Sequence, residues 1–373
     1  MFSVPALQLL FRLSIPCSPF PIEAVRRDTT SRVDLFWEEV WRPLGIALVG
    51  LGKYATGQLA PALQQTRLCV LAGIVTGTPD KARRWQQQYS LPKENIYSYE
   101  TFDEIADNPA IDIIYVVLPN AMHAEYVIRA ARAKKHVICE KPMAVTVQQC
   151  QAMIDACRDH GVRLSIGYRL HFEPHTQEMM RLGQKQIYGP VQAITAQDGM
   201  AIGDPNQWRL KKALAGGGPL MDVGIYCVQA ACYVTGEKPV AIESASLKDG
   251  SAPAFAEVEE ELAWTMRFPS GATADCLTSY SRKLNLLDVR ARQGRFTLQP
   301  AYSYRGIQGR TPQGAMHFPQ VNQQALQMDD FAHCVMTGQP TRVPGEMGLR
   351  DVKLLQAIYE AADSHRAVAL DWT

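Results

Sequence analysis

The stretch GLGKYA, residues 50–55, has a glycine spacing that could bind the phosphates of a dinucleotide. Gly50, Gly52 and Ala55 fill the three small positions of the G-x-G-x-x-G/A motif, after an apolar run and before a helical pattern. Gly50 permits the tight turn, Gly52 lets a pyrophosphate approach the backbone, and Ala55 lets the helix pack against the strand. Such a turn can simply connect a strand to a helix, but amides at a helix start attract anions, so we predict a dinucleotide site.

The next apolar run, VLAGIVT, indicates which dinucleotide the turn would take. An NAD site usually has Asp or Glu about 20 residues after the glycines, where the carboxylate binds the ribose hydroxyls. This run ends at Thr76 without a carboxylate, and Lys81, Arg83 and Arg84 follow. A hydroxyl backed by cations suits the 2′-phosphate of NADP, which we predict as the cofactor. The alternative is that these cations form the solvated face of a helix.

Lys141, Asp222 and Tyr226 are residue types that could handle protons beside such a cofactor. Lys141 lies in CEKPM, directly after an apolar run, and so at the carboxyl edge of the predicted sheet, where ligands bind. Asp222 and Tyr226 are four residues apart in DVGIY, so on a helix they project from the same face. The alternatives are a core tyrosine and an acidic residue at a helix N-terminus. The combination with a dinucleotide site favours chemistry.

The elements that must position these residues differ between the two halves of the chain. From Gly45 to about Gly167, short β-branched runs alternate with helical stretches, which predicts a doubly wound parallel sheet. After Gly167, the sequence ELAWTMRFPSGATADCLTSY alternates apolar and polar residues around a turn at Pro269 to Gly271, which predicts antiparallel strands. RDVKLLQAIYEAADSH, residues 350–365, has helical spacing and is expected to pack on that sheet or on the first domain.

We therefore predict an α/β protein with an N-terminal Rossmann domain and a C-terminal α+β domain that contains a large, mostly antiparallel sheet. The expected boundaries are an N-terminal arm at 1–43, the NADP-binding domain at 44–167, and a substrate-binding and oligomerisation domain at 168–373. In the arm, VPALQLLFRLSIPC has no basic residue before it, is interrupted by Arg12 and is too short for a bilayer. We expect neither a signal peptide nor a membrane span there, and a short amphipathic helix over Arg32 to Trp41.

Composition excludes several classes of protein. With a net charge of +1 and no run of basic residues, the chain has no electrostatic footprint for nucleic acid or an anionic membrane. Its nine cysteines form no C-x-x-C pair, so we expect mostly buried free thiols and a reducing compartment. His171 and His175 have the i, i+4 spacing of metal ligands, but Pro174 between them disfavours a helix, so we expect pocket or core histidines and no metal.

Several longer motifs closely resemble the glucose-fructose oxidoreductase branch of the glucose-fructose oxidoreductase and inositol dehydrogenase family. They are GLGKYA, LPNAMHAEY, CEKPM, IGYR, DPNQWRL, ALAGGGPLMDVGIY and PGEMGLRDVKLLQAIYEAA, which together cover nearly all of the chain after the arm. The resemblance implies that NADP is bound by Gly50, Gly52, Lys53, Tyr54, Ala55, Thr76, Lys81, Leu118, Pro119, Asn120, His123, Glu140, Lys141, Arg169, Trp208 and Arg209. It also implies catalysis by Lys141 and Tyr226 with support from Asp222; many relatives have histidine in place of this tyrosine.

This resemblance implies hydride transfer between the anomeric carbon of an aldose and NADP. Tyr226 would take the hydroxyl proton, helped by the charge of Lys141. The resemblance also implies that oxidation of glucose is coupled to reduction of fructose. The alternatives are a simple NADP-linked sugar dehydrogenase or reductase with exchangeable cofactor, and a non-catalytic sensor of dinucleotide or sugar. Family members are dimers or tetramers, so we expect a homodimer or homotetramer. Cytoplasmic location is expected because residues 1–43 lack a twin-arginine signal, although family analogy would allow the periplasm.

Overall fold

The computed structural model describes residues 42–248 and 253–372. The chain from Pro43 onward forms one compact unit. The helix expected over Arg32 to Trp41, and Cys17, lie outside the described residues.

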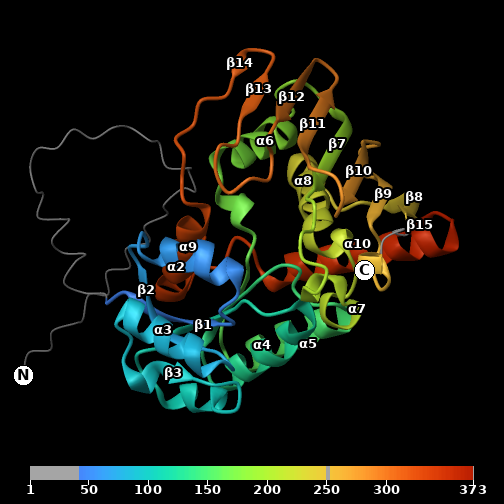
Figure 1. Cartoon of the computed structure of the whole chain (residues 1–373). Helices are drawn as coiled ribbons and strands as arrows, with labels where there is room; N and C mark the ends of the chain where they lie inside the picture. The colour runs from blue at the N-terminus through green and yellow to red at the C-terminus, as the bar shows by residue number, and fades with distance from the viewer. Residues whose placement is uncertain (1–41, 249–252, 373) are drawn as a thin grey trace, which may run out of the picture. The chain divides into compact units, whose positions relative to one another are not determined.

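The first half of this unit contains a six-stranded parallel sheet with the strand order β3-β2-β1-β4-β5-β6 (Figure 1). The strands are β1 (Leu44–Val49), β2 (Cys69–Val75), β3 (Ile96–Tyr97), β4 (Ile113–Val116), β5 (His136–Cys139) and β6 (Leu164–Ile166). The order reverses between β1 and β4, and at such a switch point the carboxyl ends of the strands leave room for a ligand. The predicted Rossmann sheet is confirmed.

Helices cover both faces of this sheet because its strands are apolar on both sides. On β1, Ala47 and Val49 pack toward one hydrophobic cluster, while Ile46 and Leu48 pack toward the other. The connecting elements are η1 (Ala55–Leu59), α2 (Ala60–Leu63), α3 (Pro79–Tyr89), η2 (Lys93–Asn95), η3 (Phe102–Asp107), η4 (Asn120–Met122), α4 (His123–Arg132) and α5 (Val147–Asp159). The alternation along one strand thus supplies both cores, as a doubly wound sheet requires.

The second half contains a nine-stranded sheet with the order β14-β13-β12-β11-β7-β10-β9-β8-β15. Its strands are β7 (Val191–Gly199), β8 (Ala241–Lys248), β9 (Glu261–Arg267), β10 (Thr273–Ser279), β11 (Leu284–Ala291), β12 (Gly294–Leu298), β13 (Gly309–Thr311), β14 (Gly314–Ala315) and β15 (Val368–Ala369). All neighbours are antiparallel except β7 and β10, which are parallel. The large, mostly antiparallel sheet is confirmed, and the predicted turn joins β9 to β10.

One face of this sheet is buried by helices. On β9, Leu262, Trp264 and Met266 are buried, as their alternation predicts. The helical segments of this half are η5 (Arg169–Phe172), α6 (Pro174–Gln184), η6 (Trp208–Leu210), α7 (Lys212–Ala215), η7 (Leu220–Gly224), α8 (Ile225–Thr235), η8 (Pro253–Phe255), α9 (Gln323–Thr337) and α10 (Gly345–Ser364). The predicted C-terminal helix is α10, and it contacts both β8 and α5, so it joins the two halves.

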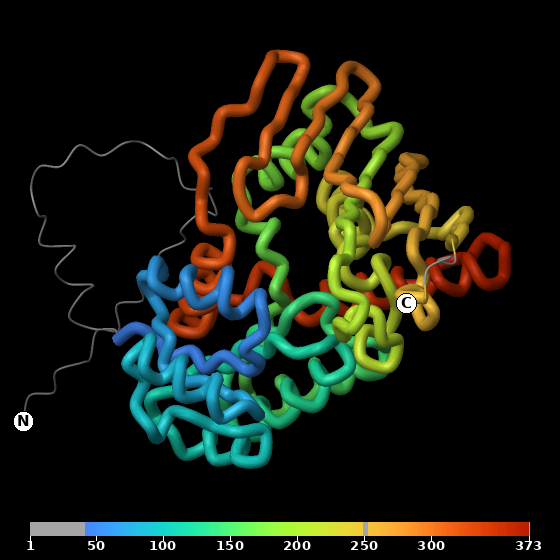
Figure 2. Tube along the Cα trace, viewed as in Figure 1, coloured from blue at the N-terminus to red at the C-terminus, as the bar shows by residue number. Residues whose placement is uncertain are grey.

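Helix α9 returns to the first half of the chain, a feature that the sequence reading did not include. In Figure 2 this late segment lies beside the early helix α2, and the two are in contact. Met328 and Phe331 of α9 belong to the same buried cluster as Leu48 of β1. The carboxylate of Asp329 accepts hydrogen bonds from the amides of Arg67 and Leu68, at 2.9 and 2.8 Å. The core of the dinucleotide half therefore includes residues from the C-terminal part of the chain.

Candidate active site

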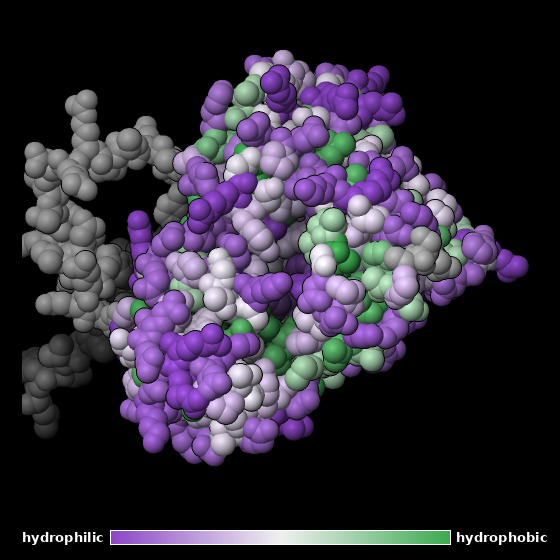
Figure 3. Space-filling view, in the orientation of Figure 1, coloured by the Kyte–Doolittle hydropathy of each residue, from purple (hydrophilic) through white to green (hydrophobic). Residues whose placement is uncertain are grey.

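A cleft of about 1300 Å³ lies at the carboxyl edge of the parallel sheet, and the face shown in Figure 3 is hollowed near its centre. Its walls come from loops of the first half and from strand ends and loops of the second half. The sequence-predicted residues that line it are Gly50, Gly52, Lys53, Tyr54, Thr76, Lys81, Leu118, Pro119, Asn120, His123, Glu140, Lys141, Arg169, Trp208, Arg209, Asp222 and Tyr226. Ala55 does not line the cleft, because it is buried behind the turn.

The glycine turn has the geometry that its spacing predicts. Gly50 has a φ of +93°, and a Cβ there would lie 2.6 Å from the carbonyl oxygen of Val117. A Cβ on Gly52 would meet no protein atom within 4 Å, so the missing side chain leaves space in the cleft itself. Ala55 opens η1 against the sheet. The turn thus offers backbone and a helix start to an anionic group.

Three cationic residues follow β2 in the chain, and one of them lines the cleft. Thr76 is buried, and its hydroxyl accepts a hydrogen bond from the amide of Thr78 at 3.3 Å. Lys81 lines the cleft, whereas Arg83 forms an ion pair with Asp80 on the exposed side of α3. Arg84 is also exposed and does not line the cleft. The solvated-face interpretation therefore holds for the two arginines, and Lys81 is the one of these three cations that lines the cleft.

The ring of His123 lies between two loops of the cleft and can donate a hydrogen bond to a carbonyl group of one of them. Its Nδ1 lies 2.9 Å from the carbonyl oxygen of Pro142, and its Nε2 lies 2.8 Å from that of Leu118. The ring is fully buried, and this burial lowers the pKa of His123. Hydrogen bonding to the two carbonyl groups raises this pKa but does not outweigh burial. Asn120, also buried, donates to the carbonyl oxygen of Ala215 at 2.8 Å. Both side chains are thus occupied with holding the loops that line the cleft.

Glu140 is a buried carboxyl under the same cleft. Its Oε1 accepts a hydrogen bond of 2.7 Å from Tyr115, whose oxygen in turn accepts one of 2.8 Å from Gln327 of α9. Burial raises the pKa of Glu140, although the bond from Tyr115 and the charge of Lys141 oppose this. A Cβ on Gly167 would lie 2.6 Å from Oε1, so the glycine of the IGYR motif makes room for this carboxyl.

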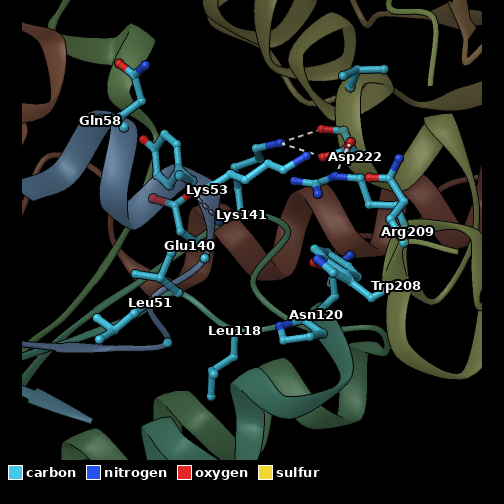
Figure 4. Close-up of a pocket in the computed structure, with 18 of the residues that line it drawn as sticks. Leu51, Lys53, Gln58, Leu118, Asn120, Glu140, Lys141, Trp208, Arg209 and Asp222 are labelled. Carbon is cyan, nitrogen blue, oxygen red and sulfur yellow. Dashed lines mark hydrogen bonds and ion pairs between the residues drawn. The ribbon is translucent and has the colours of Figure 1, made fainter. Parts of the chain in front are cut away.

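Lys141 and Asp222 form a buried ion pair at the centre of the cleft (Figure 4). The Nζ atom of Lys141 lies 3.5 Å from Oδ1 of Asp222 and also donates to the Asp222 carbonyl oxygen. Oδ2 of Asp222 accepts from Arg209 at 2.8 Å and from Tyr280 at 3.2 Å. Asp222 lies in η7, and Arg209 reaches it from η6. The carboxylate therefore has two cations and a hydroxyl as partners.

These contacts determine the charges of the pair. Burial would raise the pKa of Asp222, but Arg209 and Lys141 outweigh it and hold this pKa below its ordinary value. Burial would likewise lower the pKa of Lys141, but Tyr226 and Asp222 raise it above the ordinary value. Near neutral pH the pair is thus an ammonium and a carboxylate. A carboxylate with a lowered pKa is a weak base, so Asp222 is suited to hold Lys141 rather than to take protons.

Tyr226, at the start of α8, lies between two cations. The ammonium of Lys141 lies 4.5 Å from the centre of its ring, and the guanidinium of Arg169 lies 5.1 Å from it. Arg169 is 2% exposed and donates to the carbonyl oxygen of Tyr302 at 2.6 Å and to the side chain of Gln323. The Tyr226 ring therefore has two cationic groups of the cleft as close neighbours. Of the three expected catalytic residues, Tyr226 is thus the one suited to release and accept a proton.

Some residues that line the cleft were absent from the sequence-based prediction. They are Gln58, Thr78, Tyr99, Asp198, Asp204, Gln207, Asn285, Tyr302, Ser303, Tyr304 and Arg305. Most lie in the second half, whose loops reach the cleft only through long-range packing. A signal did exist for one of them: Ile194, Ala196 and Asp198 alternate along one strand, so a carboxylate occupies an otherwise apolar row.

The remaining candidates from the sequence lie apart from this chemistry. His171 packs edge-on against Tyr233, and burial lowers the pKa of His171 to about 4. His175 is buried and contacts the carboxylate of Glu173 at 2.8 Å. Among the described residues, no group of three His, Cys, Asp or Glu side chains is arranged to hold a metal ion. The expected free thiols are confirmed for the cysteines in this part of the chain, all of which are buried.

The parallel sheet with its glycine turn and the cleft at its carboxyl edge define a dinucleotide-binding protein of the Rossmann type, and comparisons with known proteins identify its family. Residues 44–168 match the oxidoreductase family with an NAD-binding Rossmann fold known as GFO/IDH/MocA, and residues 176–297 match a C-terminal domain of the same family. The chain belongs to this GFO/IDH/MocA oxidoreductase family. The family resemblance and the expected class of enzyme are thereby confirmed.

Similar proteins act on sugars. The chain is 31% identical to D-xylose 1-dehydrogenase [NADP(+)] from Haloarcula marismortui, over 88% of this chain and 94% of the relative. It is 28% identical to D-xylose 1-dehydrogenase (NADP(+)) 2 from Haloferax volcanii, over 87% and 99%. The crystal structure of aldose-aldose oxidoreductase from Caulobacter crescentus, complexed with glycerol, has a TM-score of 0.86 and 46% identity over 88% of this chain and 100% of that one.

Proposed function

We propose that this protein is an NADP-dependent sugar oxidoreductase that transfers hydride between the anomeric carbon of an aldose and the nicotinamide. The observation that carries the proposal is the convergence of Lys141, Asp222 and Tyr226 in a cleft whose other wall is the glycine turn. The NADP-linked sugar dehydrogenases and the aldose-aldose oxidoreductase among its relatives support both the cofactor and the substrate class.

The residues of the cleft fit NADP. The open space at Gly52 and the start of η1 suit a pyrophosphate, and Lys81 beside Thr76 suits a 2′-phosphate. Leu118, Pro119 and Glu140 line the region between the turn and Lys141. When bound, NADP supplies the acceptor or donor of hydride.

The protein's own groups handle the proton. In the oxidation of an aldose, the anomeric C–H bond breaks with its electron pair leaving as hydride, and the hydroxyl on the same carbon loses a proton as the carbonyl of the lactone forms. Tyr226 takes that proton, with the ammonium of Lys141 4.5 Å from the centre of its ring. Asp222, itself held by Arg209 and Tyr280, keeps Lys141 in place. Reduction follows the same steps in reverse.

Two modes of turnover are distinguished by the fate of the cofactor. In the first, NADP stays bound and a second sugar takes the hydride, a mode supported by the relative that acts between two aldoses. In the second, NADP exchanges with solution, as the xylose dehydrogenases suggest. The presence of both Lys141 and Tyr226 in the cleft disfavours a non-catalytic sensor.

The test is to purify the protein without added cofactor and to follow the absorbance of reduced nicotinamide. Absorbance that rises with glucose and falls with fructose or a second aldose would support retained NADP and a coupled transfer. No change until NADP is supplied, followed by steady formation of NADPH, would support the exchangeable mode. Lys141→Met is the matched control and should give neither signal. Failure of every aldose and ketose tested to change the redox state of NADP would refute the proposal.

We also propose that the protein is a homodimer or homotetramer, which light scattering would test. Among the described residues, no helix is long and apolar enough to cross a membrane.

A further inference from the structure

Asp198 is a carboxyl group in a position that packing alone would give to an apolar residue. It is the next-to-last residue of β7 and follows Ile194 and Ala196 on the buried face of that strand. Its neighbours across the sheet are Thr278 on β10 and Asn285 on β11. Strand β7 packs against α8, and it ends just after Asp198. At this end of the strand the side chain of Asp198 lines the cleft.

The surroundings of this carboxyl differ from those of Asp222. Asp198 is 7% exposed, and among the described residues no side chain donates a hydrogen bond to its carboxylate; the adjoining amide of Gly199 lowers its pKa only in small part. The positive charges of Lys141 and Arg169 lower the pKa of Asp198, and the negative charge of Asp222 raises it. Within the described residues, neither cation forms an ion pair with Asp198. Its carboxylate thus keeps hydrogen-bonding capacity that Asp222 has already used.

A buried carboxyl without a strong partner is costly, so its presence needs a compensating group. Cys227 and Tyr302 lie near Asp198 but donate their hydrogen bonds elsewhere. Cys227 donates to the carbonyl oxygen of Leu277, and Tyr302 donates to that of Leu286. What the carboxylate lacks is a donor on the cleft side. A sugar hydroxyl is a donor of the right kind, and a site built to bind a hydroxyl strongly rejects substrates that lack it.

We propose that Asp198 binds a hydroxyl group of the sugar away from the reacting carbon, and so selects polyhydroxylated substrates. This inference rests on the proposed function. Burial raises the pKa of Asp198 to about 7, so the carboxyl is close to the balance between its two protonation states near neutral pH. As a carboxylate it accepts a hydrogen bond from the hydroxyl, and as a carboxylic acid it can donate one. It is a positioning group for the substrate and takes no part in the hydride or proton transfer itself.

The experiment pairs a variant of Asp198 with sugars that lack one hydroxyl. Asp198→Ala removes the acceptor, and the substrates are the aldose that the wild type turns over fastest and its monodeoxy analogues. We expect Asp198→Ala to lower kcat/KM for the full sugar by about 10- to 100-fold, mainly through KM. With the analogue that lacks the bound hydroxyl, the two enzymes should agree within about threefold, because the interaction is already gone. The affinity for NADPH, measured by fluorescence, should not change.

Asp275→Asn is the control, because Asp275 lies on the exposed face of β10 and contacts Thr265 instead of the cleft. If Asp198→Ala does not fold, Asp198→Leu keeps a similar branched shape, has no hydrogen-bond acceptor and carries the same cycle. The inference is overturned if Asp198→Ala lowers kcat/KM for every deoxy analogue by the same factor as for the full sugar. It is also overturned if the variant binds NADPH less tightly, or if it lowers kcat and leaves KM unchanged. No turnover of any aldose by the wild type would refute the proposed function instead, and this inference with it.

Discussion

Replacing Asp198 with asparagine should stabilise the unliganded protein, and more so in mildly alkaline than in mildly acidic solution. In the folded chain this carboxyl is 7% exposed, with one backbone hydrogen bond, whereas in the unfolded chain it is hydrated. Burial therefore disfavours its charged form, and Lys141 and Arg169 compensate only in part. The asparagine side chain has nearly the same shape and carries no charge at any pH.

The magnitude follows from the pKa. Burial raises the pKa of Asp198 from its ordinary value of 3.8 to about 7. The folded state thus binds this proton more tightly than the unfolded state does, so stability falls as pH rises from about 4 to about 7 and is constant above that. The cost of the carboxyl is about 2 kcal/mol near pH 5 and about 4 kcal/mol near pH 8. The stability gained by Asp198→Asn should therefore be about 2 to 3 kcal/mol larger near pH 8 than near pH 5.

Urea unfolding of both proteins at the two pH values measures this difference, because any constant effect of the amide cancels. Asp275→Asn makes the same chemical change on the exposed face of the same sheet and is the matched control for the substitution itself. A difference between Asp198→Asn and wild type that does not depend on pH would refute the reasoning, since the folded carboxyl would then keep its ordinary pKa. A stabilised variant that binds sugar poorly would be the usual trade between stability and function.

Four other changes have defined outcomes. Lys141→Met should lower kcat for an aldose by at least about 100-fold while circular dichroism shows intact folding; normal turnover would contradict its role. Tyr226→Phe should cause a loss of similar size with intact folding by circular dichroism, and full activity would exclude it as the base. Lys81→Ala should raise the Kd for NADP by about 10-fold and spare that for NAD, whereas equal effects on both would place the 2′-phosphate elsewhere. Gly167→Ala should lower stability by about 1 to 3 kcal/mol in urea unfolding, because its Cβ would lie 2.6 Å from Oε1 of Glu140; an unchanged midpoint would show that Glu140 can move away.

Features that depend on neighbouring residues were readable in the sequence. The glycine turn could be located because tight turns and close phosphate approach demand small residues at set intervals, and Gly50 has the positive φ that this demand implies. The strands could be recognised because burial on one or two faces produces alternating or continuous apolar runs, as on β9 and β1. The family motifs added the residues that follow β4 and β5, which line the cleft.

Two features were not readable because they depend on contacts far apart in the chain. Helix α9 has an apolar face like other helices, and nothing in that pattern indicates that it packs against β2 and α2 rather than the nearer sheet. His123 lines the cleft as expected, but its ring nitrogens also face the carbonyl oxygens of Leu118 and Pro142. A hydrogen bond between a side chain and the backbone of another loop leaves no pattern in the sequence.

The sequence by itself determined the elements of this protein: a dinucleotide turn at Gly50 to Ala55, a parallel sheet, and an antiparallel sheet, because each depends on local backbone geometry and side-chain period. The tertiary structure alone decided how the site is assembled. Lys141 meets Asp222 across 81 positions of the chain, and Arg169 meets Gln323 across 154. Such meetings depend on how the two sheets pack, and packing is the sum of many distant apolar contacts that no short stretch encodes. The same packing brings Asp198 to the cleft with an unused acceptor.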